Sequence, residues 1–575
     1  MGYPGTMFRA CLALAVAALA GVAGLAQNVR LPQVAEASLS NGIKVLVVER
    51  PGSGAVHVRL FIRGGRANTG GLPPAAADLL ARSLFRRAVP GNLEPRLESE
   101  LEREGGAFEA LRLNRLAQAR LPQGGQILGA PDTASLEALE ENALAALDRD
   151  LGPVESWDAL DALGATSREL ETSADFLCTA MDLPAASLPG WCQVQAGVLR
   201  TLPMGRFPME REQLVQDIVA GHPPSPPSLS VLLATALAGR PYALAAEFHQ
   251  AEVESLSWKD LKTFAQREAA PDNISLVLVG DVQAPAVIPI LERSFGSLPR
   301  GPVSQARWEG APVFQAGDPV SSLESPGGRR LLASTTGDTR VFFGWRVPPA
   351  NHPDGSALRA LVQILGGAPS ARLQQKLLGD RGLARRVTVQ AGVPGRRDVN
   401  LLVIEAEPNE GHSLDELEQA IQDEVLRLQR EPLTGAEVRQ AQVQMEAAEV
   451  RVQEDARTLG TALGTAECQG GDWRLAFRAL GADGKLKAAE IQRVARTYLV
   501  PSQAVIVQLG PDPLLLPLDR TESRLLQVLT ALLRPKLGDS IQAQAVLREA
   551  VRQLRMLSPK EREQTLKLLE SQVHP

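Results

Sequence analysis

The residues that could perform acid–base or metal chemistry are few and widely spaced in this chain. The six histidines are scattered along it, at His57, His222, His249, His352, His412 and His574. No two of them have the spacing of a pair of metal ligands on one helix. A carboxylate and a cation, Asp78 and Arg82, do stand four residues apart in the largely apolar segment GLPPAAADLLARSLF. On a helix these side chains share a face, so we expect them to form an ion pair.

Other reactive groups give weaker signals. Cys178 and Cys192 are close enough in sequence to form a disulfide, and Cys468 would then be unpaired. The alternative is that all three cysteines are buried as small apolar residues. The glycine pairs at 64–65 and 366–367 lack the Lys-Ser/Thr of a phosphate-binding loop and are typical of turns. The formal net charge of -6 and the even spread of Lys and Arg argue against nucleic-acid binding.

The Asp78 segment lies among elements typical of a mixed α and β domain. Strands are expected at 43–48 and 56–62, a core helix at 75–87, and a charged helix at 97–106 that glycines close. An Ala/Leu/Glu-rich segment at 123–167 has apolar residues at helical spacing. A helix at 258–268, an apolar strand at 274–279 and a helix at 286–295 complete this half of the chain.

A second set of elements follows a Gly/Pro/Ser-rich linker. Strands are expected at 340–347, 386–406 (a pair) and 504–509, and helices at 356–365, 413–430, 434–455 and 490–498. The segment LKTFAQREAAPDNISLVLVGD at 261–281 matches IQRVARTYLVPSQAVIVQLGP at 491–511 in its order of helix, proline, apolar strand and glycine. Because this match falls at the end of both halves, we interpret the chain as a duplication with an α+β fold.

Both ends of the chain differ from these halves. Arg9 precedes an apolar run that ends in the small-x-small site Gly24-Leu25-Ala26, which predicts a signal peptide cleaved after Ala26. An uncleaved anchor is the alternative, and no other segment is predicted to span a membrane. The tail at 512–575 has apolar residues at helical spacing and is read as a packing appendage, with a partner-binding module as the alternative.

Several segments together resemble the insulinase/pitrilysin-type zinc metallopeptidase family, also called inverzincins. They are LSNGIKVLVVE, RPYALAAEF, PDNISLVLVGDV, FGSLPRGP and GGAPSARLQQKLLGDRGLARRV, in the family's order. The resemblance covers about residues 37–511 and implies a first insulinase-like domain at 37–305, with the helical insertion at about 123–167, and a second insulinase-like domain at 331–511. The predicted signal peptide at 1–26, the linker at 306–330 and the helical tail at 512–575 complete the division of the chain.

The same resemblance implies that the zinc site of the family is altered here. The family's His-x-x-Glu-His motif places two histidines and a general base on one helix, and a distant Glu completes the ligands. In this chain Asp78 stands at the first His, Ala81 at the base, Arg82 at the second His, and Asp217 at the distant Glu. A fixed positive charge at Arg82 would repel zinc, so we expect no zinc cofactor and no catalytic residues.

The second half carries the family's substrate-binding segment in changed form. Arg372 matches the Arg that contacts substrate, and Arg385 takes the place of its Tyr partner. Two interpretations of Arg372 stay open: it contacts a bound peptide, or it is an ordinary surface arginine.

These expectations define a function. We expect an exported, periplasmic or secreted, catalytically inactive bacterial homologue that binds peptide for an active insulinase-family partner subunit or stabilises it as a heterodimer. An active zinc endopeptidase that uses Asp78 and Asp217, and a stand-alone envelope scaffold, are the two alternatives.

Overall fold

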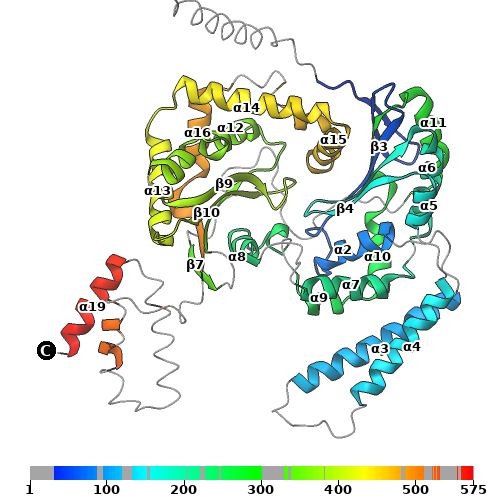
Figure 1. Cartoon of the computed structure of the whole chain (residues 1–575), viewed down its shortest axis with the longest axis horizontal. Helices are drawn as coiled ribbons and strands as arrows, with labels where there is room; N and C mark the ends of the chain where they lie inside the picture. Colours follow the sequence, from blue (N-terminus) through cyan, green and yellow to red (C-terminus); the bar gives the residue numbers. More distant parts are fainter. Residues whose placement is uncertain are drawn as a thin grey trace, which may run out of the picture.

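The chain folds around two β-sheets, one in each half of the sequence (Figure 1). The computed structural model describes residues 31–510 except 87–94, 120–131, 152–155, 203, 221–226, 245–247, 301–328, 335–338, 381, 479 and 481–485, together with short stretches of the C-terminal tail. The predicted signal peptide, residues 306–328 of the linker, residues 123–131 of the insertion and most of the tail lie outside the described residues.

The first sheet has six strands in the order β1-β2-β6-β3-β5-β4. Their bounds are β1 Ala35–Ser38, β2 Lys44–Glu49, β3 Ala55–Arg63, β4 Thr166–Thr172, β5 Phe176–Pro184 and β6 Ile274–Gly280. Only the pairing of β2 with β6 is parallel. The strand β4 therefore forms one edge of the sheet, and its outer side has no partner strand among the described residues.

The second sheet has five strands in the order β7-β11-β8-β10-β9. Their bounds are β7 Arg329–Ser334, β8 Arg340–Val347, β9 Ala384–Val393, β10 Asn400–Pro408 and β11 Val505–Gly510. Here β11 pairs in parallel with β7 and antiparallel with β8, as β6 does with β2 and β3. The predicted repeat is thus confirmed in space, because its two copies occupy equivalent places in the two sheets, where β2-β6-β3-β5-β4 corresponds to β7-β11-β8-β10-β9.

Helices cover both sheets. In the first half they are α2 Ala75–Ala81, α3 Pro95–Ala119, α4 Thr133–Leu151, α5 Ser156–Ala162, α6 Leu188–Thr201, α7 Phe207–Val219, α8 Pro227–Ala236, α9 Gln250–Glu254, α10 Trp258–Glu268 and α11 Ala284–Phe295. In the second half they are α12 Gly355–Gly366, α13 Leu414–Arg430, α14 Gly435–Glu454, α15 Ala456–Gly470 and α16 Ala488–Tyr498. The helix α19 Pro559–Val573 belongs to the tail.

Short helical turns connect several of these elements. They are the π-helical turns η1 Arg82–Arg86 and η6 Gln374–Asp380, and the 3₁₀ turns η2 Ala185–Ser187, η3 Pro241–Leu244, η4 Pro271–Asn273, η7 Trp473–Phe477 and η9 Pro501–Gln503. Capping boxes mark where two long helices of the second half begin, because Ser413 with Glu416 opens α13 and Thr434 with Glu437 opens α14.

Each half contributes one helix to the sheet of the other half. The first-half helix α8 contacts β8 and β11, and the second-half helix α15 contacts β3 and β6. Figure 1 shows both helices in the middle of the molecule, between the two sheets. This exchange buries the inner face of each sheet and joins the halves into one body.

One helix is longer than the sequence analysis predicts. The expected helix at 97–106 continues as α3 through Gly105 and Gly106 to Ala119, so the prediction that glycines close it is wrong. The apolar residues Leu101 and Leu111 are buried at helical spacing on either side of the glycines. Their burial outweighs the cost of about 1 kcal/mol for each glycine in a helix. With α4, α3 forms a hairpin that projects from the body (Figure 1).

Two further observations concern membranes and thiols. Among the helices that the structure describes, none combines the length and hydropathy needed to span a bilayer.

Cys178, Cys192 and Cys468 are all buried as free thiols, so Cys178 and Cys192 do not form a disulfide here. Burial raises the pKa of the Cys192 thiol to about 12, as expected for a small core residue.

Candidate functional site

The helix α2, which carries Asp78 and Ala81, is completely buried, and the turn after β3 sets its position. After β3 the chain runs beside the turn between β4 and β5, where the Gly64 amide donates to the Asp175 carbonyl at 2.9 Å and the Arg66 amide to the Ser173 carbonyl at 2.9 Å. A Cβ atom on Gly65 would lie 2.1 Å from the Ser173 carbonyl oxygen. Only glycine fits this approach, which brings the side chain of Arg66 onto α2.

The three charged positions of the altered motif take part in two ion pairs, one of which is made with Arg66. Arg66 holds Asp78 with both arms of its guanidinium, from Nε to Oδ2 at 2.7 Å and from Nη2 to Oδ1 at 2.8 Å. Arg82 donates from Nη2 to Asp217 Oδ2 at 2.7 Å. The expected ion pair between Asp78 and Arg82 is therefore wrong. The bidentate fork of Arg66 occupies both Asp78 oxygens, and α7 supplies Asp217 as the carboxylate for Arg82.

The contact between α2 and α7 is what the family alignment requires. Arg82 and Asp217 are 135 residues apart in sequence, yet they touch where the second His and the distant Glu would bind one metal ion. Gln213 also donates to Asp217, at 3.1 Å, from the preceding turn of α7. The backbone therefore still brings these positions together.

The side chains at these positions do not fit a zinc ion. Zinc needs three nitrogen, sulfur or oxygen ligands and one open position for water. Here a guanidinium stands at one ligand position, and both carboxylates bind guanidinium groups. Ala81 offers only a methyl group where a base would accept the proton of water. Within the described part of the chain, no group of three or more His, Cys, Asp or Glu side chains could hold a metal ion.

The two arginines of the second half pair within their own domain. Arg372 donates from Nε to Glu437 at 2.7 Å, and Glu437 is also the capping residue of α14. Arg385 on β9 donates to Glu407 on β10 at 2.9 Å. Arg372 is mostly buried, whereas about half of the Arg385 side chain is exposed. Both positive charges are therefore compensated by carboxylates inside the second half.

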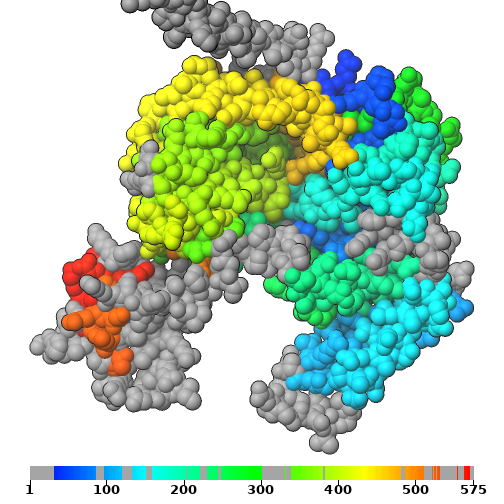
Figure 2. Space-filling model, in the orientation of Figure 1, coloured from blue at the N-terminus to red at the C-terminus, as the bar shows by residue number. Residues whose placement is uncertain are grey.

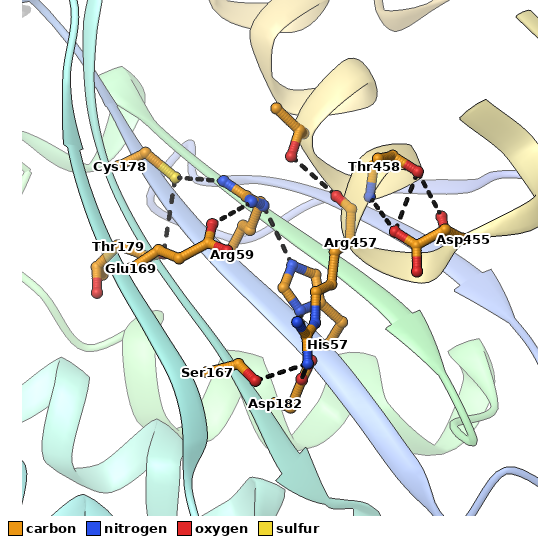
Figure 3. Close-up of polar contacts among 11 residues, drawn as sticks. His57, Arg59, Ser167, Glu169, Cys178, Thr179, Asp182, Asp455, Arg457 and Thr458 are labelled. Carbon is orange, nitrogen blue, oxygen red and sulfur yellow. Dashed lines mark hydrogen bonds and ion pairs between the residues drawn. The ribbon is translucent and has the colours of Figure 1, made fainter. Parts of the chain in front are cut away.

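A polar network that the sequence analysis did not identify covers the inner face of the first sheet (Figure 3). His57 Nδ1 lies 2.7 Å from Asp182 Oδ1, Arg59 Nε donates to His57 Nε2 at 3.1 Å, and Arg59 Nη2 binds Glu169 at 2.7 Å. Arg457, at the start of α15, binds Asp182 from the other half of the molecule. The signal was present as the polar positions i and i+2 of the strand VHVRLFI, which place His57 and Arg59 on one face of β3.

A second buried group of polar atoms centres on Asp175. The Tyr242 hydroxyl donates to Asp175, the Arg396 amide donates to it at 2.8 Å, and Gln469 Nε2 donates to it at 2.9 Å. The Tyr242 hydroxyl also accepts from the Arg397 amide at 2.8 Å. Burial raises the pKa of the Asp175 carboxyl although each of these hydrogen bonds favours its charged form. This carboxylate therefore links the first sheet, the segment after α8, the β9–β10 turn and α15.

Comparison with known proteins now places the chain. Residues 255–445 match the family described as the Peptidase M16 inactive domain. The zinc protease PqqE of Helicobacter pylori (strain ATCC 700392 / 26695) is 24% identical over 273 residues, which is 45% of this chain and 56% of that protein. The chain is a relative of the insulinase-type M16 peptidases.

Solved structures agree with this assignment at the level of the fold. The crystal structure of a protease from Helicobacter pylori has a TM-score of 0.61 and 18% identity, over 84% of this chain and 100% of that chain. The first half of the periplasmic protease PqqL from Escherichia coli has a TM-score of 0.55 and 13% identity, over 84% of this chain and 93% of that chain. The prediction of two insulinase-like domains in tandem is thus confirmed. The sequence match to the curated relative spans little more than half of that protein's length.

Proposed function

We propose that this chain is an exported, catalytically inactive member of the M16 family that holds peptide for an active partner protease of the same family, or stabilises it. The observation that carries the proposal is the ion pair between Arg82 and Asp217, because it fills the place of two zinc ligands with a cation and its counter-ion. The match of residues 255–445 to the Peptidase M16 inactive domain supports membership of the family, and the altered motif lies outside these residues.

Water activation is the step that this arrangement lacks. A zinc peptidase lowers the pKa of a bound water and passes its proton to a general base. The guanidinium of Arg82 would repel a divalent cation, and Ala81 cannot accept a proton. The proposed function therefore includes no zinc cofactor and no catalytic residue in this chain.

Peptide binding is supported by the open edge of the first sheet. The edge strand β4 contacts both α2 and the π-helical turn that begins at Arg82. An extended peptide that added a strand to β4 would form main-chain hydrogen bonds and pass beside the altered motif. Such binding requires only backbone groups and pockets for alternate side chains, so it does not depend on the lost chemistry.

An exported location and a partner subunit complete the proposal. The predicted signal peptide and the periplasmic location in the name of the similar PqqL protein support the first. The proposed partner is an M16 subunit that retains the His-x-x-Glu-His motif, since that subunit would supply the metal chemistry.

The test compares the purified chain alone and mixed with an intact M16 protease from the same genome. Zinc content and cleavage of a peptide mixture are measured in each sample, with and without a chelator. We expect substoichiometric zinc and no cleavage for the chain alone, co-elution with the partner, and faster cleavage by the mixture than by the partner by itself. Stoichiometric zinc with chelator-sensitive cleavage by the chain alone would instead establish the active endopeptidase. A chain that remains monomeric beside every such protease would favour the envelope scaffold.

A restored motif provides the matched control. Replacing the four motif positions together, as Asp78→His, Ala81→Glu, Arg82→His and Asp217→Glu, recreates the family's ligand set on the same backbone. We expect this variant to take up zinc that the native chain does not bind, which would show that the side chains, and not the fold, exclude the metal.

A further inference from the structure

The second half of the molecule contains a cavity of about 470 Å³ that is far from the altered motif in sequence. Its walls come from the end of β8 and the start of α12, from the β9–β10 turn, and from α15 with the turn that follows it. Figure 2 shows the surface hollowed at this place, between the yellow helices α14 and α15 and the green α12. The volume is within the range of sites that bind small molecules.

Among the described residues, the charged side chains that line this cavity are all positive. They are Arg359, Arg396 and Arg478, and no described Asp or Glu lines it. Among the described residues Arg478 donates to backbone carbonyl groups, including that of Ala350 at 3.0 Å. A cavity with this lining favours a ligand that brings a negative charge.

Arg396 is the arginine that most requires a counter-ion. Its guanidinium makes one long hydrogen bond, to the Ala391 carbonyl at 3.4 Å, and no ion pair with any described residue. The residue is exposed at the cavity, yet the protein packed around its guanidinium and the charge of Arg359 lower its pKa. Gly392 permits this position, since a Cβ atom there would lie 2.3 Å from Arg396 Nε.

Arg359 supplies a second donor on the same wall. It binds Glu449 through Nη2 at 2.6 Å, while its buried Nε has no hydrogen-bond partner among the described residues. A neighbouring cavity of about 300 Å³ shares Arg359, Ala391 and Arg396 with the larger one. Both guanidinium groups therefore lie at the junction of two hollow spaces.

Most of the remaining wall is apolar, with small and aliphatic side chains that include Leu358, Val452, Ala462, Ala466 and Leu475. Its polar members are Asn400, Thr458, Thr461, Thr465 and Gln469. An apolar chain would displace water from these surfaces at a gain of about 25 cal/mol for each Å² that it covers. One part of the cavity lining is therefore mainly apolar, and another part is positively charged.

We propose that this cavity binds a carboxylate that carries an apolar chain, with the carboxylate at Arg396 and Arg359 and the chain against α15. Two sources share this chemistry, namely the C-terminal residue of a peptide with an apolar side chain and a free medium-chain fatty acid. The proposal does not depend on the function proposed for the β4 edge, because no residue of the altered motif or of β4 lines the cavity.

Calorimetric titration of the full-length chain tests the proposal with matched pairs of probes. The first pair is octanoate and octanol, and the second is the peptide acetyl-Gly-Leu-Leu with a free or an amidated C-terminus. We expect at least one of the two acids to bind with a dissociation constant below about 1 mM, and its neutral analogue to bind about tenfold more weakly or not at all. Binding of octanoate alone identifies a fatty acid, binding of the free peptide alone identifies a peptide terminus, and both results support the shared chemistry.

Variants locate the binding in this cavity. Arg396→Gln should weaken binding of the acid about tenfold or more, because it removes the charge that meets the carboxylate. Ala462→Trp should block the apolar part while leaving every arginine in place. Arg439→Gln, an exposed arginine on α14, serves as the control and should leave binding unchanged. The circular dichroism spectrum confirms that each variant is folded. The proposal is overturned if neither acid binds, if acid and neutral analogue bind equally, or if Arg396→Gln and Ala462→Trp bind as the native chain does.

Discussion

The helices α8 and α15 occupy comparable places on opposite sheets, but they cover them in different ways. The first, α8, packs an apolar surface that includes Leu232, Leu233 and Ala236 on the second sheet. The second, α15, approaches the first sheet through glycines, where a Cβ atom on Gly464 would lie 2.0 Å from the Phe61 ring. Near its N-terminus, α15 meets the polar network of His57, Arg59 and Asp182 instead of an apolar core (Figure 3).

This difference shows how two domains with the same topology have diverged. The core of the second half is continuous across both faces of its sheet. In the first half a large apolar core lies under the outer helices, and a separate, smaller one lies under α15. The polar groups of the inner face thus gather in the half that contains the altered motif and the open edge of β4. In the second half, the apolar residues of α8 belong to the same cluster as the rest of that core.

The largest effect is expected at Asp175, which binds both the turn η3 after α8 and the helix α15. This carboxylate binds Tyr242 after α8 and Gln469 in α15, so Asp175→Ala leaves several buried donors without an acceptor. We expect a loss of about 3–5 kcal/mol in the free energy of unfolding. Urea denaturation followed by circular dichroism should show two separate transitions where the native chain shows one, because the halves lose their common anchor.

The variant Asp175→Asn serves as the control for this prediction. An amide oxygen can still accept two of the hydrogen bonds, so the loss should be smaller and the two halves should still unfold together. If Asp175→Ala unfolds in one transition with a loss below about 1 kcal/mol, the carboxylate does not anchor the halves.

Truncation of the apolar helix should have the next largest effect. Leu233 on α8 is completely buried, and Leu233→Ala should cost about 2–5 kcal/mol through lost burial and the cavity left behind. The matched variant on α15 is Leu463→Ala, which is equally buried but belongs to the smaller cluster. We expect it to cost less, because the surrounding polar face relaxes more easily. If the two variants lose the same free energy of unfolding in thermal or urea denaturation, the two helices do not differ in how tightly they pack.

A smaller effect is expected from adding a methyl group to α15. The variant Gly464→Ala would overpack the contact with Phe61 and should cost about 1–3 kcal/mol, despite the better helix propensity of alanine. The control is Gly105→Ala in α3, where nothing lies within 4 Å of the added atom. There the same substitution should stabilise the chain by up to about 1 kcal/mol. Stabilisation by both variants in thermal unfolding would show that α15 does not rest closely on the first sheet.

The sequence predicted correctly those elements whose ends are set by neighbouring residues, such as helix caps and turns. The helix α10 has the predicted bounds 258–268, because its amphipathic pattern begins at a capping box formed by Ser257 and Asp260. The strand β8 has the predicted bounds 340–347. The duplicated segment was also recognisable, since its proline and glycine positions mark the turns on each side of β6 and β11.

Elements that depend on distant partners were not predicted. The sequence analysis assigns neither β4, β5 nor α15, and α15 has a Gly/Thr/Ala-rich sequence whose burial comes from the sheet of the other half. The motif positions show the same limit. The spacing of Asp78 and Arg82 suggested a local ion pair, but tertiary structure supplies Arg66 and Asp217 as stronger partners. The positions of the site were therefore predictable, whereas its pairing was not.

The smallest predicted effect concerns the pH dependence of the polar network. Burial lowers the pKa of His57 below its ordinary value of about 6.5, although the hydrogen bond with Asp182 opposes this shift. Above that value the histidine is neutral in both the folded and the unfolded chain. As the pH falls through about 6.5, the unfolded chain takes up the proton first, so stability falls until the lower pKa of the folded state is reached.

The variant His57→Gln isolates this contribution. Its amide can still accept from Arg59 but does not titrate, so the decline in stability between about pH 7 and pH 5 should become shallower than in the native chain. The titration of Asp182 does not overlap with that of His57 in this pH range. Its own pKa is lowered, despite burial, by the hydrogen bonds from His57 and Arg457, so its contribution is lost only at still lower pH. The partly exposed His412, just before α13, provides the control, because His412→Gln lies in the other half, outside the network, and should leave the slope unchanged. If His57→Gln and the native chain show the same slope in urea unfolding across this range, the inner face of the first sheet does not sense pH through His57.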